Sequence, residues 1–278
     1  MTQPPKQSVL GVEISATNYG ELLRLCRDWI ACRRELPQKL SRGHYTAMLT
    51  VHSVMTAVRE PAYRVVLNGA DVAAPDGMPL AWALRSFGVH GQPRVYGPDL
   101  MLAICGQAAR LGHRIFLYGG REETLPVLCR RLIGRFPRLQ IAGSYSPPFR
   151  PLTPEEDDGC TDMIRSSDPD IVFVGIGAPK QERWMAMHAG KLPGVVMFGV
   201  GAAFDFHTGR VKQAPVWMQR SGLEWLFRIY AEPRRLWKRY ILTNPAFLLM
   251  WLLQRIGILR YPEATGRWET STPLEGSK

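Results

Sequence analysis

The sequence predicts an α/β fold, with a Rossmann-like, mostly parallel sheet that carries helices on both faces. Short runs that are apolar throughout recur between about Thr46 and Val200, and longer segments with helical spacing separate them. Wholly apolar strands that alternate with helices are typical of a parallel sheet buried on both faces. In addition, the runs end near glycines, and the helices that follow begin at Pro98, Pro179 or acidic residues, as helix N-termini do.

The elements follow in chain order. The segment VLGVEIS (9–15) predicts a short strand, and residues 18–36 predict an amphipathic helix. The predicted strands of the sheet are TAMLTV (46–51), YRVVLN (63–68), HRIFLYG (113–119), LQIAG (139–143), DIVFVGIG (170–177) and GVVMFGVG (194–201). The predicted helices between them span residues 77–87, 98–111, 121–136, 153–166 and 179–191.

Length and composition predict one large domain with an appendage. The chain has 278 residues, of which 46% are apolar and 21% are charged, as in globular proteins. We expect a Rossmann-like core over residues 1–208 and a basic helical appendage over 209–260. Residues 261–278 are rich in Gly, Thr, Ser and Pro, which predicts a flexible tail.

The charge of the chain is concentrated in the appendage. The net charge is +11, which calls for an anionic partner such as a nucleotide phosphate, a nucleic acid or an acidic membrane surface. Between residues 209 and 260, Glu224 and Glu232 are the only acidic residues among many arginines and lysines. The same stretch holds four tryptophans, at positions 217, 225, 237 and 251.

An apolar run near the C-terminus, ILTNPAFLLMWLLQRIGIL (241–259), is too short to span a membrane. Asn244 and Pro245 interrupt it and Arg255 closes its longest clean part, whereas a spanning helix requires about 20 apolar residues. Two interpretations stay open: a helix that lies in the membrane interface, with arginines toward anionic lipid, and an ordinary core helix with solvated arginines.

The cysteines indicate a reducing compartment. There are five, they are scattered along the chain and no two form a CxxC pair. This pattern argues against a disulfide framework and against a thiolate zinc site. The N-terminal segment MTQPPKQSVLGVEIS has no long apolar stretch, so we expect no signal peptide and a cytoplasmic protein.

Two glycine-containing turns could hold a phosphate at the carboxyl edge of the sheet, where open parallel sheets bind ligands. VGIGAPKQERW (174–184) follows a predicted strand and begins a helix, but Lys180 stands where a dinucleotide fingerprint has its third glycine. In GVGAAF (199–204) that position is Phe204. Each pair of glycines can equally be a tight packing turn, so both interpretations stay open.

Other candidate motifs are weak. Asp205, in FDFHTGR, follows a strand and could hold a sugar hydroxyl or simply form a turn. The DPD sequence at 168–170 resembles a metal-binding DxD, but it precedes a strand and so lies at the wrong end of the sheet. The six histidines show no HxH or HxxxH spacing, and no GxSxG is present. We therefore expect neither a metal nor a cofactor.

Asp76 lies in NGADVAAPDGMPLAW (68–82), a segment that begins as a loop and ends as a helix. It stands between Pro75, whose φ is fixed, and Gly77, which tolerates unusual backbone angles. This context predicts a sharp loop-to-helix corner. The carboxylate could be a helix N-cap or a group that takes part in catalysis.

Together these segments resemble the WecG/TagA/CpsF family, glycosyltransferase family 26. The matching text is TVHSVMTA, NGADVAAPDGMPLAW, RVYGPDLM, DIVFVGIGAPKQERWM, VGAAFDFHTGRVKQAP and GLEWLFRIYAEPRRLWKRYI, from about residue 45 to residue 245. The resemblance implies a metal-independent, inverting transferase. Such an enzyme moves a hexose, often N-acetylmannosamine, from a UDP-sugar to a polyprenyl-diphosphate-linked sugar in teichoic-acid, common-antigen, capsule or exopolysaccharide synthesis.

The resemblance also implies roles for residues. Asp76 matches the base that takes the proton of the acceptor hydroxyl, although a helix N-terminus beside it would lower its basicity. Without a metal, arginines and backbone N–H groups must stabilise the leaving diphosphate. The substrate-binding candidates are Thr50, His52, Asn68, Arg94, Gly177, Gln181, Asp205, Arg228, Arg234 and Arg235.

One position departs from the family. Relatives usually have Asn two residues after the threonine, and this chain has His52. Asn offers a donor and an acceptor in one plane, whereas neutral His offers one of each in a different geometry. The transferred sugar is therefore open between N-acetylmannosamine and a plain hexose such as glucose.

The resemblance implies a protein on the inner face of the cytoplasmic membrane, with a UDP-sugar, a lipid-linked acceptor and an anionic surface as partners, and it leaves a homo-oligomer open. Two other classes are weaker. A nucleic-acid-binding protein would explain the charge, but no helix-turn-helix, zinc-finger or RNP signature is present. A nicotinamide oxidoreductase is disfavoured by Lys180 and Phe204.

Overall fold

A computed structural model describes residues 3–35 and 42–261 of the chain. The predicted tail beyond Tyr261 lies outside the described residues. Within them, one sheet has six strands in the order β4-β3-β8-β7-β5-β6, and all its neighbouring strands run parallel. The predicted α/β class with a mostly parallel sheet is therefore confirmed. Its strands are β3 (His44–Leu49), β4 (Val72–Pro75), β5 (Arg114–Gly119), β6 (Gln140–Tyr145), β7 (Ile171–Gly175) and β8 (Val196–Gly199).

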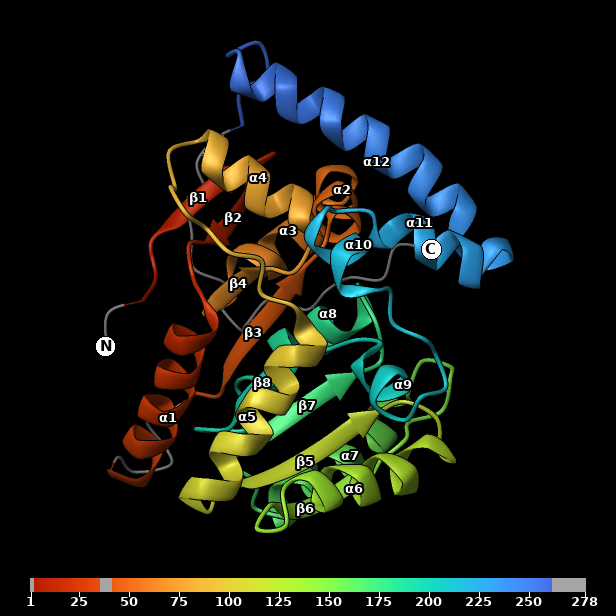
Figure 1. Cartoon of the computed structure of the whole chain (residues 1–278). Coiled ribbons are helices and arrows are strands. Elements are labelled where there is room, and N and C mark those ends of the chain that lie inside the picture. Colours follow the sequence, from red (N-terminus) through yellow and green to blue (C-terminus); the bar gives the residue numbers. More distant parts are fainter. Residues whose placement is uncertain (1–2, 36–41, 262–278) are drawn as a thin grey trace.

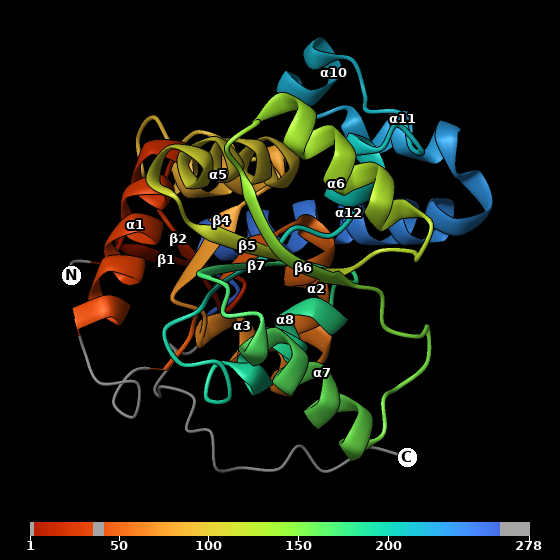
Figure 2. The ribbon, with the colours of Figure 1, turned by 90° about the horizontal axis from the view of Figure 1, so that it is seen from below.

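Helices cover both faces of the sheet (Figures 1 and 2). One face carries α1 (Tyr19–Glu35), α5 (Gly97–Leu111), α6 (Thr124–Arg135) and the short α9 (Ala203–His207). The other carries α2 (Val51–Arg59), α3 (Pro61–Asn68), α7 (Pro154–Ser166) and α8 (Lys180–His188). The central strands β3, β7 and β8 are buried along nearly their whole length, which explains why their sequences are continuously apolar.

Residues 63–68 form a helix and not the predicted strand. YRVVLN lies in α3, and the edge strand of the sheet is β4, Val72–Pro75. Pro61 occupies the first helical turn, and the buried residues Tyr63, Val66 and Leu67 have helical spacing. The β-branched valines suggested a strand, but the burial of one helical face against its neighbours determines the structure here.

The N-terminal strand prediction is also incomplete, because VLGVEIS contributes to a hairpin. Strands β1 (Lys6–Val9) and β2 (Val12–Ser15) pair antiparallel around a turn at Leu10 and Gly11, where φ is 52° and 81°. Positive φ at both central residues is the geometry of a tight hairpin turn. The side chain of Asn68 holds this hairpin in place, since it accepts from the N–H of Glu13 at 2.9 Å and donates to the carbonyl of Gly11 at 3.1 Å.

Three helices follow the core: α10 (Val216–Arg220), α11 (Glu224–Ala231) and α12 (Pro233–Arg255). The long α12 crosses above α2 and α4 (Met78–Ser86) in Figure 1. Gln254 fastens its end to the hairpin, with its Oε1 accepting from the N–H of Leu10 at 2.8 Å. Among the described residues, no helix has the length and apolar character needed to cross a membrane.

The strand ends approach one another closely at Gly119. Its φ is +116°, and a Cβ there would lie 2.6 Å from the carbonyl carbon of Gly175 at the end of β7. Only glycine accommodates both the backbone angle and this contact. The glycines at the ends of the predicted strands therefore allow β5 and β7 to finish side by side.

Candidate active site

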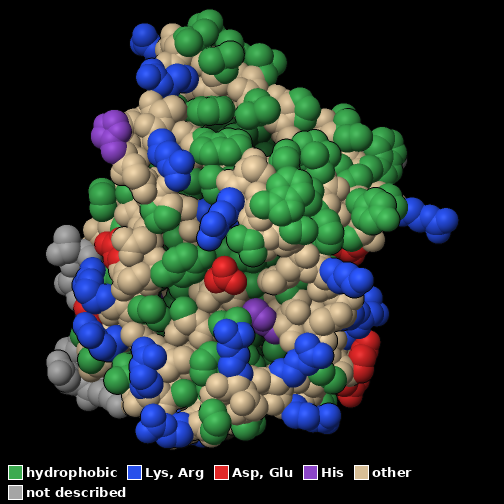
Figure 3. Space-filling view, in the orientation of Figure 1, with side chains coloured by type: hydrophobic (Ala, Val, Ile, Leu, Met, Phe, Trp, Pro, Cys, Tyr) green, Lys and Arg blue, Asp and Glu red, His purple; other side chains and the backbone are tan. Residues whose placement is uncertain are grey.

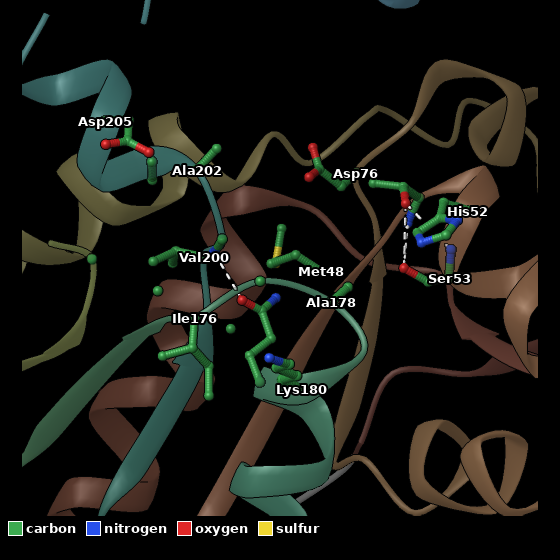
Figure 4. A pocket seen from close by; sticks show the side chains of 18 of the residues that line it. Met48, His52, Ser53, Asp76, Ile176, Ala178, Lys180, Val200, Ala202 and Asp205 are labelled. Atoms are coloured by element: carbon green, nitrogen blue, oxygen red, sulfur yellow. Dashed lines mark hydrogen bonds between the residues drawn. The ribbon is translucent and has the colours of Figure 1, made fainter. Parts of the chain in front are cut away.

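A cavity of about 1080 Å³ opens at the carboxyl ends of the parallel strands. Residues that follow β3, β4, β5, β7 and β8 line it, and α11 forms part of its wall. This is the edge where open parallel sheets bind ligands. Figure 4 shows Asp76 and His52 on one side of the cavity, Asp205 on another and Lys180 below them.

Asp76 stands at the predicted corner, directly after β4. Its backbone N–H donates to the carbonyl of Leu49 at 2.8 Å, which ties the ends of β3 and β4 together. The N-cap of α4 is Gly77, and no side chain caps that helix. The Asp76 carboxylate instead accepts a long hydrogen bond, 3.4 Å, from the N–H of Gly97 at the start of α5. The carboxylate therefore does not cap the helix that follows it in the sequence.

The environment of Asp76 makes it an unusually basic carboxylate. Its side chain is 17% exposed. Burial raises the pKa of Asp76 to about 6; Arg94 opposes this change and Glu224 reinforces it. A general base works best when its pKa lies near the working pH. The effect of burial, which raises the pKa, is therefore larger than the opposite effects of Arg94 and the Gly97 N–H, which stabilise the anion.

Arg94 lies between two carboxylates. Its Nη2 is 2.6 Å from Oε2 of Glu224 and 3.6 Å from Oδ1 of Asp76, and its Nε donates to the backbone carbonyl of Asp76. Its guanidinium also stacks over the ring of Tyr96 at 4.1 Å, and the Tyr96 hydroxyl donates to Glu224 at 3.3 Å. Burial alone would lower the pKa of Arg94, but the two carboxylates outweigh it and the net pKa is raised.

Thr50 and His52 line the cavity where β3 passes into α2. Thr50 is the N-cap of α2, and its hydroxyl accepts from the N–H of Ser53 in a capping box. His52, the second residue of α2, lies on the same side of the cavity as Asp76 in Figure 4. The structure therefore brings both predicted substrate-binding residues to the site, and Thr50 also has a structural role.

The side chain of Gln181 connects the two glycine-containing turns, residues 174–184 and 199–204, by a hydrogen bond. Its Oε1 accepts from the N–H of Gly201 at 3.0 Å, and its Nε2 donates to Glu182 at 2.8 Å. Gly177, at φ +82°, lies in the first of these turns and lines the cavity. Both turns thus border one cavity, and the amide of Gln181 links them.

Glu182 accepts a hydrogen bond from the side chain of Gln181 and holds it in place. It is fully buried and accepts a hydrogen bond from the hydroxyl of Tyr63 at 3.0 Å. Burial raises the pKa of Glu182, while the hydrogen bonds from Gln181 and Tyr63 counteract this. A buried carboxyl with these partners fixes the orientation of the Gln181 amide.

Asp205 lies in the first turn of α9 and lines the cavity opposite Asp76 (Figure 4). Its backbone carbonyl accepts from the N–H groups of Arg210 and Val211. The side chain remains available to the cavity. Two residues later, His207 bonds to the carbonyl of Pro98 at 3.0 Å, and burial lowers its pKa, so that its imidazole is neutral at pH 7.

Arg228, on α11, is a half-buried cation in the cavity wall. Within the part of the chain that the structure describes, its Nε has no hydrogen-bond partner, and its guanidinium lies 5.7 Å from the ring centroid of Phe206. Burial would lower its pKa, but Tyr240 and Glu224 outweigh that effect and raise it, so Arg228 stays charged. A buried donor without a partner beside a cavity is suited to an anionic ligand.

Two predicted site residues lie elsewhere, and a third falls outside the description. Asn68 does not line the cavity, because its amide is committed to the β1–β2 hairpin. Arg234 is exposed at the start of α12 and does not line the cavity either. The side chain of Arg235 lies outside the described residues.

Glu224 and Tyr96 were not predicted from the sequence, although both contact Arg94 directly. The sequence feature that could have drawn attention to Glu224 is that it is an acidic residue within a strongly basic stretch. Tyr96 follows Arg94 by two residues, in the motif that carried Arg94.

No metal site is evident in residues 3–35 and 42–261, where no three His, Cys, Asp or Glu side chains gather closely enough to hold an ion. The DPD residues lie at the amino end of β7, away from the cavity. Asp168 pairs with Arg33 at 2.7 Å, and Asp170 accepts from the N–H of Arg114 at 2.9 Å. Both carboxylates therefore serve the structure at that edge of the sheet.

Comparison with known proteins identifies the family. The Glycosyl transferase WecG/TagA/CpsF family pattern matches residues 7–260. The chain is 33% identical over 192 residues to an N-acetylglucosaminyldiphosphoundecaprenol N-acetyl-β-D-mannosaminyltransferase of Bacillus spizizenii strain W23, covering 69% of this chain and 72% of the relative. A protein of the same name from Bacillus subtilis strain 168 is 33% identical over 196 residues, covering 69% and 73%. The resemblance seen in the motifs is thereby confirmed, and the chain belongs to the WecG/TagA/CpsF family of glycosyltransferases.

Proposed function

We propose that this glycosyltransferase inverts the anomeric carbon of a UDP-sugar while it moves a hexose to a polyprenyl-diphosphate-linked sugar. The observation that carries the proposal is a basic carboxylate, Asp76, beside half-buried arginines in a large cavity at the carboxyl edge of the sheet. The names of the two Bacillus relatives support a lipid-diphosphate-linked acceptor, because both specify N-acetylglucosaminyl-diphosphoundecaprenol.

In the proposed reaction Asp76 is the general base. The acceptor hydroxyl attacks the anomeric carbon, its proton passes to the Asp76 carboxylate, and the bond between that carbon and the β-phosphate oxygen breaks. One displacement of this kind inverts the anomeric configuration. A pKa of about 6 leaves Asp76 ionised at neutral pH, yet more basic than an ordinary aspartate.

Arginines are proposed to stabilise the departing UDP. Negative charge grows on the β-phosphate as the bond breaks, and pre-positioned cations in a low-dielectric site stabilise it. Arg228 has an unpaired Nε beside the cavity. The backbone turn at Gly177 borders the same space, and its N–H groups are proposed to bind a phosphate. Asp205 is proposed to bind a hydroxyl of the donor.

The C-terminal helices are proposed to rest on an anionic membrane. Hydrophobic side chains gather over α10 to α12 in Figure 3. On these helices Tyr230 is 86% exposed and Trp217 64% exposed, and Leu242, Leu249 and Leu252 are also exposed. Contiguous apolar surface marks a docking site, and the exposed Arg220, Arg234 and Arg255 suit anionic lipid. A lipid-linked acceptor would be reached from that surface, on the cytoplasmic side.

The membrane proposal is tested by flotation with vesicles. Replacing Leu242, Leu249 and Leu252 together by Ser should release the protein from vesicles that contain anionic lipid. The same changes at Leu111, Ile133 and Met163, which are exposed on core helices, form the control. Equal retention of both variants would contradict the proposal.

The sugar is proposed to be of the N-acetylmannosamine or glucose type. The relatives' names favour N-acetylmannosamine, whereas His52 in the cavity departs from the usual asparagine. In this proposal the product belongs to a wall polymer, capsule or exopolysaccharide. The family match over residues 7–260 lends no support to a nucleic-acid-binding protein or a nicotinamide oxidoreductase.

The deciding experiment is a donor screen. Purified protein is incubated with a panel of UDP-sugars and a short-chain polyprenyl-diphosphate-linked N-acetylglucosamine, and the anomeric configuration of the product is read by NMR. Transfer from one UDP-hexose with inversion is expected. Retention of configuration, or transfer only from a donor without UDP, would overturn the proposal.

A further inference from the structure

Glu224 joins the appendage to the centre of the site. It is the first residue of α11, yet its side chain is only 14% exposed and reaches Arg94 and Tyr96 in the core. The preceding turn fixes its position, because Gly222 at φ +72° packs on Trp82 of α4, where a Cβ would lie 2.5 Å from the indole. The close approach of this turn to Trp82 therefore determines where the carboxylate of Glu224 lies.

Arg94 is shared unequally by two carboxylates. Its Nη2 lies 2.6 Å from Glu224 and 3.6 Å from Asp76, so Glu224 has the direct hydrogen bond and Asp76 only a longer-range attraction. An arginine that bonded Asp76 directly would stabilise its anion and weaken it as a base. The second negative charge close by has the opposite effect on Asp76, since like charges disfavour ionisation.

We infer that Glu224 is a positioning residue, which holds Nη2 of Arg94 away from the Asp76 carboxylate and thereby keeps the base strong only when the appendage is docked. This inference rests on the proposed function of Asp76 as the base. It gives the appendage a chemical role in proton transfer, in addition to any role in binding phosphate or lipid. A core whose appendage has moved away would let Arg94 turn to Asp76, and the base would be weakened.

The charged and titratable groups around Asp76 are few. Among the described residues, Arg94, Glu224 and Arg228 influence the pKa of Asp76, and Asp76 in turn influences the pKa of Tyr19 and Tyr96. In the same cavity, His52 lies on the side of Asp76 and Asp205 lies opposite. Replacing Glu224 by Gln changes one charge among them and preserves the size of the side chain and an oxygen that accepts from Arg94. A change in the titration of Asp76 can then be assigned to that charge.

The first test uses the pH profile of kcat/KM. Wild type should lose activity below an apparent pKa of about 6. In E224Q this acidic limb should move about one unit lower, as expected when a nearby charge is removed, and the plateau rate should fall several-fold. Glu224→Asp, which keeps the charge but shortens its reach, should lie between the two.

The control is Glu155→Gln. Glu155 is also acidic and in the first turn of a helix, α7, but it is exposed and does not line the cavity. Its profile should match wild type. An E224Q profile with a lower plateau and an unmoved acidic limb would mean that Glu224 only tethers α11, and the inference would be wrong.

The second test needs no turnover, so it separates this inference from the proposed function. The pH dependence of the free energy of unfolding is compared between wild type and Asp76→Asn, which isolates the titration of Asp76. The same comparison is made after Glu224→Gln has been added to both proteins. The contribution of Asp76 to the pH dependence of the free energy of unfolding should be smaller in the proteins that carry Glu224→Gln. An equal contribution of Asp76 with and without Glu224→Gln would overturn the inference, even if Asp76 proved to be the base.

Discussion

The carboxylate of Asp76 lies 3.6 Å from the guanidinium of Arg94, near enough to attract it and too far for a hydrogen bond. The two residues come from different loops, one after β4 and one before α5. Because the two groups are separated, the Asp76 oxygens face the cavity. The hydrogen bond that they accept from the protein is the long one from the N–H of Gly97. The first two predictions depend on this carboxylate.

Asp76→Asn should lower kcat by about 10² to 10⁴, the usual cost of losing a general base. Affinity for UDP, measured by calorimetry, should stay within a few-fold, because Asn is isosteric and the arginines remain. Circular dichroism checks that the variant is folded. More than a tenth of wild-type turnover would show that Asp76 is not the base.

The same substitution should stabilise the protein at neutral pH. The pKa of Asp76 is raised from 3.8 to about 6 in the folded state, so the unfolded chain releases this proton first as pH rises. Wild type should therefore lose about 3 kcal/mol between about pH 4 and pH 6, a loss that the D76N variant cannot show. Urea unfolding at pH 4 and pH 7.5 measures it. An equal difference in unfolding free energy between wild type and D76N at both pH values would contradict the raised pKa of Asp76.

Arg228→Ala should reduce kcat/KM by about 10- to 100-fold, because a charge-assisted bond to the leaving diphosphate is lost. Retention on anionic vesicles should barely change, since one exposed charge near a membrane contributes about 1 kcal/mol and Arg228 is half-buried in the cavity wall. Arg220→Ala is the matched control: Arg220 is exposed on α10 and does not line the cavity. It should weaken vesicle binding and leave kcat/KM unchanged.

Activity should survive EDTA. The proposal assigns the charge of the leaving diphosphate to Arg228 and backbone N–H groups, and the described residues contain no metal-binding cluster of His, Cys, Asp and Glu. Activity is measured before and after dialysis against the chelator, with and without added Mg²⁺ or Mn²⁺. Loss of activity that either ion restores would mean that the assignment to arginines is incomplete.

Gly119→Ala should destabilise the fold by more than about 3 kcal/mol, since a Cβ there meets the carbonyl carbon of Gly175 at 2.6 Å and φ is +116°. Gly134→Ala is the control, because Gly134 lies in α6 and a Cβ there meets nothing within 4 Å. It should stabilise by about 0.5 to 1 kcal/mol. Denaturant unfolding distinguishes them, and similar midpoints would show that the strand ends can separate.

Much of the fold was predictable because local patterns agree with it. Apolar strands, glycines at strand ends and prolines at helix starts predicted five of the six strands and helices α4 to α8, but not α2 or α3. Residues 63–68 were misassigned, because a short β-branched segment favours a strand locally while its packing makes it a helix. Asn68 sits in a motif that borders the site, yet its amide binds the hairpin.

The sequence by itself determined the parallel sheet, the corner at Asp76 and the basic, tryptophan-rich end of the chain, because spacing, Pro and Gly act over a few residues. Only the tertiary structure decided that Asp76, Arg94 and Glu224 meet. They lie far apart in the sequence, and no local pattern encodes which carboxylate takes the arginine or how deeply each is buried. Those two quantities determine the basicity of Asp76, because desolvation and nearby charge depend on distances in space.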